Sequence, residues 1–122
     1  MQTNLFGQPL QICSTSPMTG YYRDGTCRTS TEDFGSHCVC IVVSEHFLGY
    51  SKAMGNDLST PMPAYGFEGL KDGDRWCLCA KRWAEAYKAG YAPKIDPKAT
   101  SNQATKFVDK EILLKFAIDE TR

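Results

Sequence analysis

The chain has 122 residues, 42% of them hydrophobic, and its 14 basic residues balance 14 acidic ones. This length suits a single domain over residues 1–122 with short flexible ends, and it leaves no room for a second domain. Because Lys and Arg are scattered and the net charge is zero, we expect neither nucleic acid nor an anionic membrane as a partner. No apolar run approaches the roughly 20 residues of a membrane span, so the sequence predicts a soluble protein.

The six cysteines bear on the cellular compartment. The N-terminus lacks the charged and apolar regions of a signal peptide, and the chain has no Asn-x-Ser/Thr glycosylation site. Without those marks of secretion, reduced thiols are a better interpretation than a disulfide framework. We therefore expect a cytoplasmic protein with reduced cysteines.

The N-terminal part of the chain is rich in turn formers. Leu5 to Ile12 is expected to be an extended edge segment, and Ser14 to Cys27 is dense in Pro and Gly turn signals. Asp24-Gly25 lies between Tyr21-Tyr22 and Cys27-Arg28, a pattern that predicts a tight hairpin.

A strand and a helix follow each other in the second quarter. His37 to Val43 is a short apolar and β-branched run, typical of a strand buried on both faces. Ser44 is the expected N-cap of a helix that Gly55 ends. The long connection from Asn56 to Gly73 contains aromatic residues, which predict that it packs down on the domain.

A second strand runs straight into a second helix. Arg75 to Cys79 is expected to be a strand and Ala80 to Ala89 a helix ended by Gly90. Further on, Lys94-Ile95-Asp96 lies between two prolines and fits only an edge strand or a loop.

The C-terminal part is expected to be helical. Ser101 to Phe107 suggests a short helical turn, and Asp109 is placed to cap a final helix. Taken together, the elements predict an α+β fold: a single compact two-layer domain with a small, mostly antiparallel or mixed sheet and about three helices.

The cysteine pairs suggest a metal site as one alternative. Within Cys38/Cys40 and Cys77/Cys79 the spacing of two places both thiols on one face of a strand. Zinc held by Cys40, Cys77 and Cys79 with His37 is the arrangement considered. Cysteines are also among the most often buried residues and behave there as small apolar side chains. We therefore predict no metal and no cofactor, with zinc as the alternative.

A reactive thiol is a second interpretation of the same residues. Cys79 lies just before a helix that opens with Lys81 and Arg82, a setting that favours a thiolate. His37 or His46 would have to meet it in space to act as a base. A histidine beside a buried strand is more often a hydrogen-bonded core residue.

Polar residues gather in Gly- or Pro-rich turns at the ends of the expected elements, where a rigid scaffold commonly displays binding groups. Arg suits bidentate capture of a carboxylate or phosphate, and nearby aromatic residues would wall a cavity. The other interpretation is turn chemistry, in which Asp and Asn bond their own backbone and Arg pairs with Asp. The candidate ligand-binding residues are Arg23, Asp24, Asn56, Asp57, Asp74, Arg75, Tyr22, Tyr65 and Trp76.

Several segments are distinctive as a set: Cys13–Thr15, Pro17–Gly25, Gly35–His37, Phe47-Leu48, Ser51-Lys52, Gly55–Pro61, Gly73–Cys79 and Arg82-Trp83. Together they are similar to a family of small proteins from bacteria and some eukaryotes, catalogued as domain of unknown function number two-two-three-seven. The resemblance covers about Asn4 to Asp119 and implies a single α+β domain with no named activity or cofactor. In that family the position of Cys38 is commonly Thr, which argues against a zinc site built from both Cys pairs.

Three functions follow from these patterns. The leading hypothesis is a binding domain whose polar pocket accepts a small anionic or polar ligand. The first alternative is a thiol- or metal-dependent enzyme that uses the cysteine pairs and His37. The second is a structural or interaction protein, which a large exposed apolar patch or a symmetric interface would support.

Overall fold

The computed structural model describes residues 2–118, and its centre is a three-stranded antiparallel sheet in the order β2-β1-β3. The strands are β1 (His37–Val42), β2 (Arg75–Cys79) and β3 (Lys94–Ile95). The central position of β1 explains its unbroken apolar run, because residues 38 to 41 are fully buried. The short β3 lies at the edge, as the flanking prolines predict.

Three α-helices accompany the sheet: α1 (Glu45–Ala53), α2 (Ala80–Ala89) and α3 (Lys110–Lys115). Two 3₁₀ segments, η1 (Pro63–Tyr65) and η2 (Asn102–Lys106), complete the secondary structure of residues 2–118. The predicted α+β fold is therefore confirmed, with one antiparallel sheet and three α-helices. None of the helices among residues 2–118 combines the length and the apolar character needed to cross a membrane.

Local signals place the helix ends. The side chain of Ser44 accepts a hydrogen bond from the backbone N–H of Phe47 at 3.1 Å, which caps α1. Gly90 ends α2 in the left-handed conformation, with φ 84°. Asp109 is the N-cap residue of α3, as expected, but its side chain does not make the capping hydrogen bond that the sequence predicts.

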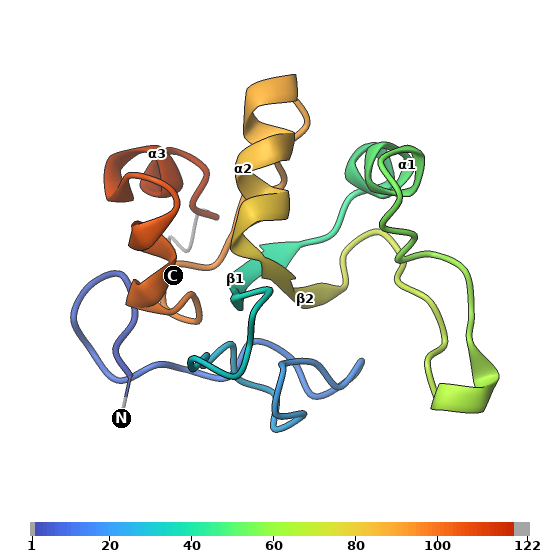
Figure 1. The fold of residues 1–122 in the computed structure, drawn as a ribbon, viewed down its shortest axis with the longest axis horizontal. Helices are drawn as coiled ribbons and strands as arrows, with labels where there is room; N and C mark the ends of the chain where they lie inside the picture. The colour runs from blue at the N-terminus through green and yellow to red at the C-terminus, as the bar shows by residue number, and fades with distance from the viewer. Residues whose placement is uncertain (1, 119–122) are drawn as a thin grey trace.

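The sheet separates two environments (Figure 1). The helices lie on one side of β1 and β2, and the N-terminal loops lie on the other. The main core includes the fully buried Trp83, whose indole Nε1 donates to the carbonyl oxygen of Pro93 at 3.2 Å. This packing holds α2, and with it the strand-to-helix junction at Cys79, in a fixed position.

Two disulfides fasten the N-terminal loops to the sheet. Cys13 is bonded to Cys40 on β1, and Cys27 is bonded to Cys77 on β2. The expectation of reduced cysteines is therefore wrong for these four residues. Cys40 and Cys77 lie opposite each other in the β1–β2 ladder, and the loop brings one partner to each. Strand register and loop path decide this pairing, and neither is visible in the cysteine spacing.

Two expectations about loops are also wrong. Gly25 does not close a hairpin with its own neighbours, because its carbonyl oxygen accepts from the backbone N–H of Cys13 at 2.7 Å. Residues 56–73 do not pack down throughout: Tyr65 is 80% exposed, and η1 projects away from the body (Figure 1). The short flexible ends expected from the sequence involve residue 1 and residues 119–122, which lie outside the described residues.

Candidate functional site

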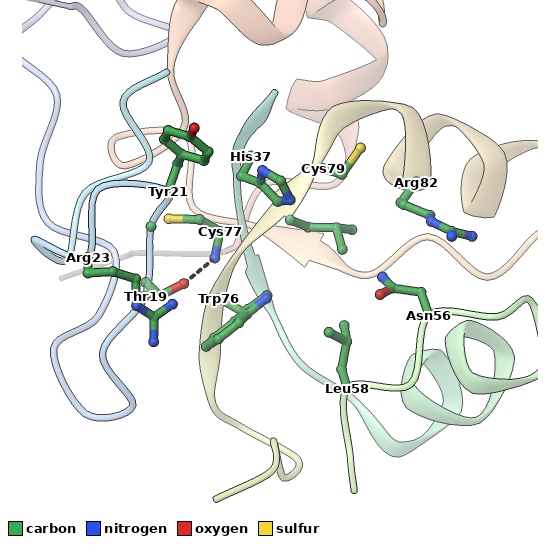
Figure 2. A pocket seen from close by; sticks show the side chains of 12 residues that line it. Thr19, Tyr21, Arg23, His37, Asn56, Leu58, Trp76, Cys77, Cys79 and Arg82 are labelled. Carbon is green, nitrogen blue, oxygen red and sulfur yellow. Dashed lines mark hydrogen bonds between the residues drawn. The ribbon is translucent and has the colours of Figure 1, made fainter. Parts of the chain in front are cut away.

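A cavity of about 500 Å³ opens between the N-terminal loop, β2 and the start of α2. Figure 2 shows side chains from these segments, and from the chain around Asn56, surrounding one space. Small-molecule sites commonly have volumes of roughly 300 to 1,000 Å³, so this cavity has a suitable size. Its chemistry is set by Arg23, His37, Asn56, Trp76, Cys79 and Arg82.

The N-terminal wall of the cavity is held against β2 by the side chain of Thr19. Thr19 is buried, and its hydroxyl oxygen accepts a hydrogen bond from the backbone N–H of Cys77 at 2.9 Å (Figure 2). Gly20 has φ 99°, and a Cβ there would collide with a backbone carbonyl oxygen, so this turn needs glycine. Arg23 also has a positive φ, 57°, and its guanidinium carbon lies 5.6 Å from the centre of the Trp76 ring. This cation–π contact directs Arg23 along the cavity wall.

His37 reaches the cavity from the start of β1 and is held from behind by Asp33. Its Nδ1 lies 2.7 Å from Oδ1 of Asp33, whose side chain is 0% exposed. The other carboxylate oxygen accepts from the backbone N–H of His37 at 2.8 Å and from the hydroxyl of Thr29 at 2.9 Å.

These contacts fix the ionisation of Asp33. Burial alone would raise its pKa, but the hydrogen bonds from His37 and Thr29 outweigh burial and hold the pKa below the usual value. The contact with Asp33 engages Nδ1 of His37, so Nε2 is the ring nitrogen left for other partners.

A β-bulge at Cys38 determines which residue lies opposite Cys79. Val39 pairs with Leu78, so an unbroken ladder would place Cys38 opposite Cys79. The register shifts between His37 and Val39, and His37 takes that position instead. Bulges often occur beside functional sites because they redirect one side chain. Here the bulge brings a histidine and a cysteine together at the cavity.

The two cysteines that the described chain leaves outside disulfides have different surroundings. Cys38 is fully buried, and burial raises the pKa of its thiol to about 12. Cys79 is half-buried, lines the cavity and is the N-cap residue of α2. Its position is the more favourable one for a reactive thiol, since helix N-termini favour negative charge.

The charge of the cavity has one sign. Arg82 comes from the first turn of α2, and one of its nitrogens donates to the carbonyl oxygen of Met54 at 3.1 Å. A guanidinium has five N–H donors, so others remain for a ligand. Arg23 and His37 line the same space, and none of the described residues that line it is acidic. Outside the lining, the same Arg82 nitrogen also lies 3.5 Å from Oε1 of Glu85.

Three of the nine candidate residues from the sequence meet in this cavity: Arg23, Asn56 and Trp76. Arg23 also borders two further hollows. One of them contains Asp57 and Tyr65, and the other contains Asp74. Arg23 is therefore the residue that connects the predicted set.

Two carboxylates among the predicted residues, those of Asp57 and Asp74, accept hydrogen bonds from groups within their own turns. Asp57 accepts from the hydroxyl of Thr60 at 2.5 Å and from the backbone N–H of Ser59 at 3.0 Å. These hydrogen bonds, the one from the Thr60 hydroxyl first, lower the pKa of Asp57 to about 2. Asp74 accepts from the backbone N–H of Lys71 at 2.9 Å. Both carboxylates serve turn chemistry, the other interpretation that the sequence left open.

The remaining three candidates contact residues outside the cavity. Arg75 donates to Asp96 at 2.6 Å. Asp24 accepts from the Nε of Arg28 at 2.8 Å, and that guanidinium lies 4.0 Å from the centre of the Tyr22 ring. Arg28 thus links Asp24 and Tyr22 into a surface cluster of their own.

The zinc alternative loses two of its ligands in this structure. Cys40 and Cys77 are disulfide-bonded, so neither offers a free thiolate beside Cys79 and His37. A different grouping of sulfurs occurs at the disulfides, where the Sγ atoms of Cys13, Cys27 and Cys77 lie within 4.8 Å of one another.

The sequence analysis names Arg82 as a cation near Cys79 but not as a ligand-binding residue, and it does not name Asp33. Arg82 follows Cys79 by three residues, a spacing that places both on one face at the start of a helix, and this signal was available. Asp33 lies in an irregular loop, where no periodicity links it to His37. Only the folded chain reveals that pair.

Fold and cavity together define a small α+β domain with an open cavity, lined by two arginines, at a strand-to-helix junction. Residues 3–117 match the family described as an uncharacterized protein conserved in bacteria, domain of unknown function two-two-three-seven, and the chain belongs to that family. The expected family membership is thereby confirmed. Among curated proteins, none matches the chain.

Proposed function

We propose that this protein is a binding domain whose cavity takes a small ligand with a carboxylate or phosphate group. The observation that carries the proposal is the convergence of two guanidinium groups, those of Arg23 and Arg82, on one cavity of about 500 Å³ without an acidic lining residue in the described chain. Charge-assisted hydrogen bonds from guanidinium groups are well suited to these anions. Asn56 adds an amide, and Trp76 adds a flat apolar wall for the rest of the ligand.

Backbone conformation supports the same location. Arg23 and Ser36 are the non-glycine residues of the described chain with positive φ, at 57° and 49°. Arg23 lines the cavity, and Ser36 directly precedes His37. Such conformations cost roughly 1–3 kcal/mol each and concentrate at functional sites.

The test compares two arginines of the same loop. Arg23→Asn removes a cavity guanidinium and keeps a residue type that tolerates positive φ. Arg28→Asn removes the same charge outside the cavity. Calorimetric titration with inorganic phosphate, citrate and a sugar phosphate should show affinity lowered roughly ten- to hundredfold in Arg23→Asn, the loss of one charged hydrogen bond. Equal affinities in the two variants, or no anion binding by the wild type, would contradict the proposal.

The cellular compartment and the absence of nucleic-acid partners are predictions from the sequence. The sequence predicts a cytoplasmic protein without nucleic-acid partners. The two disulfides weigh the other way on location, because such bonds persist mainly in oxidising compartments. Mapping of disulfide-linked peptides from cells lysed in a thiol-blocking reagent would decide between these.

A further inference from the structure

We propose that Cys79 is a nucleophile assisted by His37, that Asp33 positions His37, and that the cavity binds acyl compounds which carry a carboxylate or phosphate. The proposal rests on the anion-binding function above and adds a reaction to it. Its parts are two neighbouring strand residues, a buried carboxylate and a cavity with two arginines.

The geometry supplies the nucleophile and the base. Cys79 lies opposite His37 in the β1–β2 ladder, at the point where the register shifts, and both residues line the cavity. In Figure 2 the sulfur of Cys79 is turned towards α2, so rotation about the Cα–Cβ bond is needed to bring it to the ring. Hydrogen bonds between catalytic groups are commonly long before substrate binds.

His37 has the orientation that a general base requires. The hydrogen bond to Asp33 engages Nδ1 and leaves Nε2 to accept a proton. Gly35 makes room for the ring: a Cβ on Gly35 would lie 2.5 Å from Cε1 of His37. Tyr21 packs parallel to the ring with 6.3 Å between centres. The ring is thus constrained on three sides.

The reaction balances without an external oxidant or reductant. Sγ of Cys79 forms a bond to the acyl carbon as its proton passes to Nε2 of His37. The bond from the acyl carbon to the leaving group then breaks, and His37 returns the proton to that group. Water hydrolyses the resulting thioester to a carboxylic acid and restores the thiol. Arg23 and Arg82 hold the anionic end of the substrate.

The first experiment measures alkylation of the full chain without reductant, so that both disulfides stay closed. Iodoacetate and iodoacetamide form the same S–C bond with loss of iodide, but only iodoacetate is an anion. We expect Cys79 to be the modified residue and Cys38 to stay unmodified. The rate ratio of iodoacetate to iodoacetamide should exceed that of glutathione about tenfold, the effect of one favourable contact of about 1.4 kcal/mol.

Variants separate the roles. His37→Gln should slow both reagents roughly 100-fold or more, the usual effect of losing a general base. Gly35→Ala displaces the ring without removing a functional group and should slow both, while Cys38→Ser should change neither. Arg82→Gln should slow iodoacetate alone. Asp33→Asn should shift the pH dependence of the rate, an effect that altered packing alone would not produce.

The acyl step has its own readout. Mono-4-nitrophenyl terephthalate carries a carboxylate that cannot reach its own ester group, whereas 4-nitrophenyl benzoate is neutral. The charged ester should release a burst of nitrophenolate and add a 4-carboxybenzoyl group to Cys79, seen by intact mass and absent in Cys79→Ser. Thermal unfolding of each variant checks that it is folded.

The outcomes distinguish this inference from anion binding. A thiol at Cys79 that reacts no faster than glutathione with either reagent, and that responds to neither His37→Gln nor Gly35→Ala, overturns the nucleophile. Phosphate binding that still depends on Arg23 would then leave the binding proposal intact. A burst of equal size with both esters would overturn the preference for charged acyl compounds.

Discussion

Among single residues, Asp33 links stability to pH, because it is a buried carboxylate that makes three hydrogen bonds. Its pKa is lowered in the folded chain from a usual value of 3.8. A lowered pKa stabilises the fold above the unfolded-state pKa, and this stabilisation is lost as the pH falls through the folded-state pKa.

Asp33→Asn should therefore lower the free energy of unfolding by about 1–3 kcal/mol near neutral pH, since the amide presents a donor to groups that donate. The difference between wild type and variant should shrink as the pH falls below the unfolded-state pKa of 3.8, because the unfolded chain takes up the proton first, and it should be lost as the pH falls through the lower folded-state pKa. Urea unfolding at pH 7, 5, 4 and 3 measures this. If the difference in unfolding free energy stays constant from pH 7 to pH 3, protonation of Asp33 is not linked to unfolding.

Arg75 illustrates how a candidate binding residue can have a structural role. It pairs with Asp96 at 2.6 Å, and the Asp96 side chain is only 7% exposed. Arg75→Ala should cost about 1–3 kcal/mol of unfolding free energy, because a nearly buried carboxylate loses its cation. Phosphate affinity should be unchanged.

The double variant Arg75→Ala/Asp96→Asn is the control, and it should recover part of the loss, which a double-mutant cycle quantifies. A phosphate affinity that falls as far in Arg75→Ala as in Arg23→Asn would instead place Arg75 in the binding site.

At the scale of elements, the sequence predicts what local chemistry determines. Ser44 starts α1, Gly90 ends α2, and the apolar run of β1 is buried on both faces, all as expected. Each of these signals acts within a few residues of the feature it sets, so one sequence is enough to read it.

The sequence does not predict features that depend on register. The bulge at Cys38 decides that His37, rather than Cys38, faces Cys79, and it leaves no mark in the apolar pattern of β1. Three residues of the candidate site, Arg23, Asn56 and Trp76, are among those that the sequence predicts to bind a ligand, because they lie in or beside turns. The sequence does not predict that Arg82 joins them, because the position of α2 depends on the packing of the core around Trp83.

At the scale of the whole molecule, two disulfides hold the N-terminal loops on the sheet. They close loops with sequence separations of 27 and 50 residues. In the chain-entropy model such cross-links contribute about 3.5 and about 4 kcal/mol through the unfolded state.

Reduction with dithiothreitol should accordingly lower the free energy of unfolding by several kcal/mol. Urea unfolding with and without reductant measures the effect, and Cys38→Ser, which removes a buried free thiol, should lose as much stability on reduction as the wild type does. Identical unfolding curves for the oxidised and reduced protein would show that the cross-links carry no stability.

The two disulfides also have a consequence for ligand affinity. Cys13 and Cys27 tie both ends of one loop to adjacent strands, and Arg23 lies within that loop. If Arg23 holds the proposed ligand, and the ligand prefers the loop arrangement that the closed disulfides fix, the two equilibria are coupled and the coupling is reciprocal. Whatever factor the disulfides add to the affinity for the ligand, the bound ligand must add to the resistance of the disulfides to reduction. A reducing thiol pool would then lower the affinity of the protein for the ligand, and a high ligand concentration would slow reduction of the disulfides.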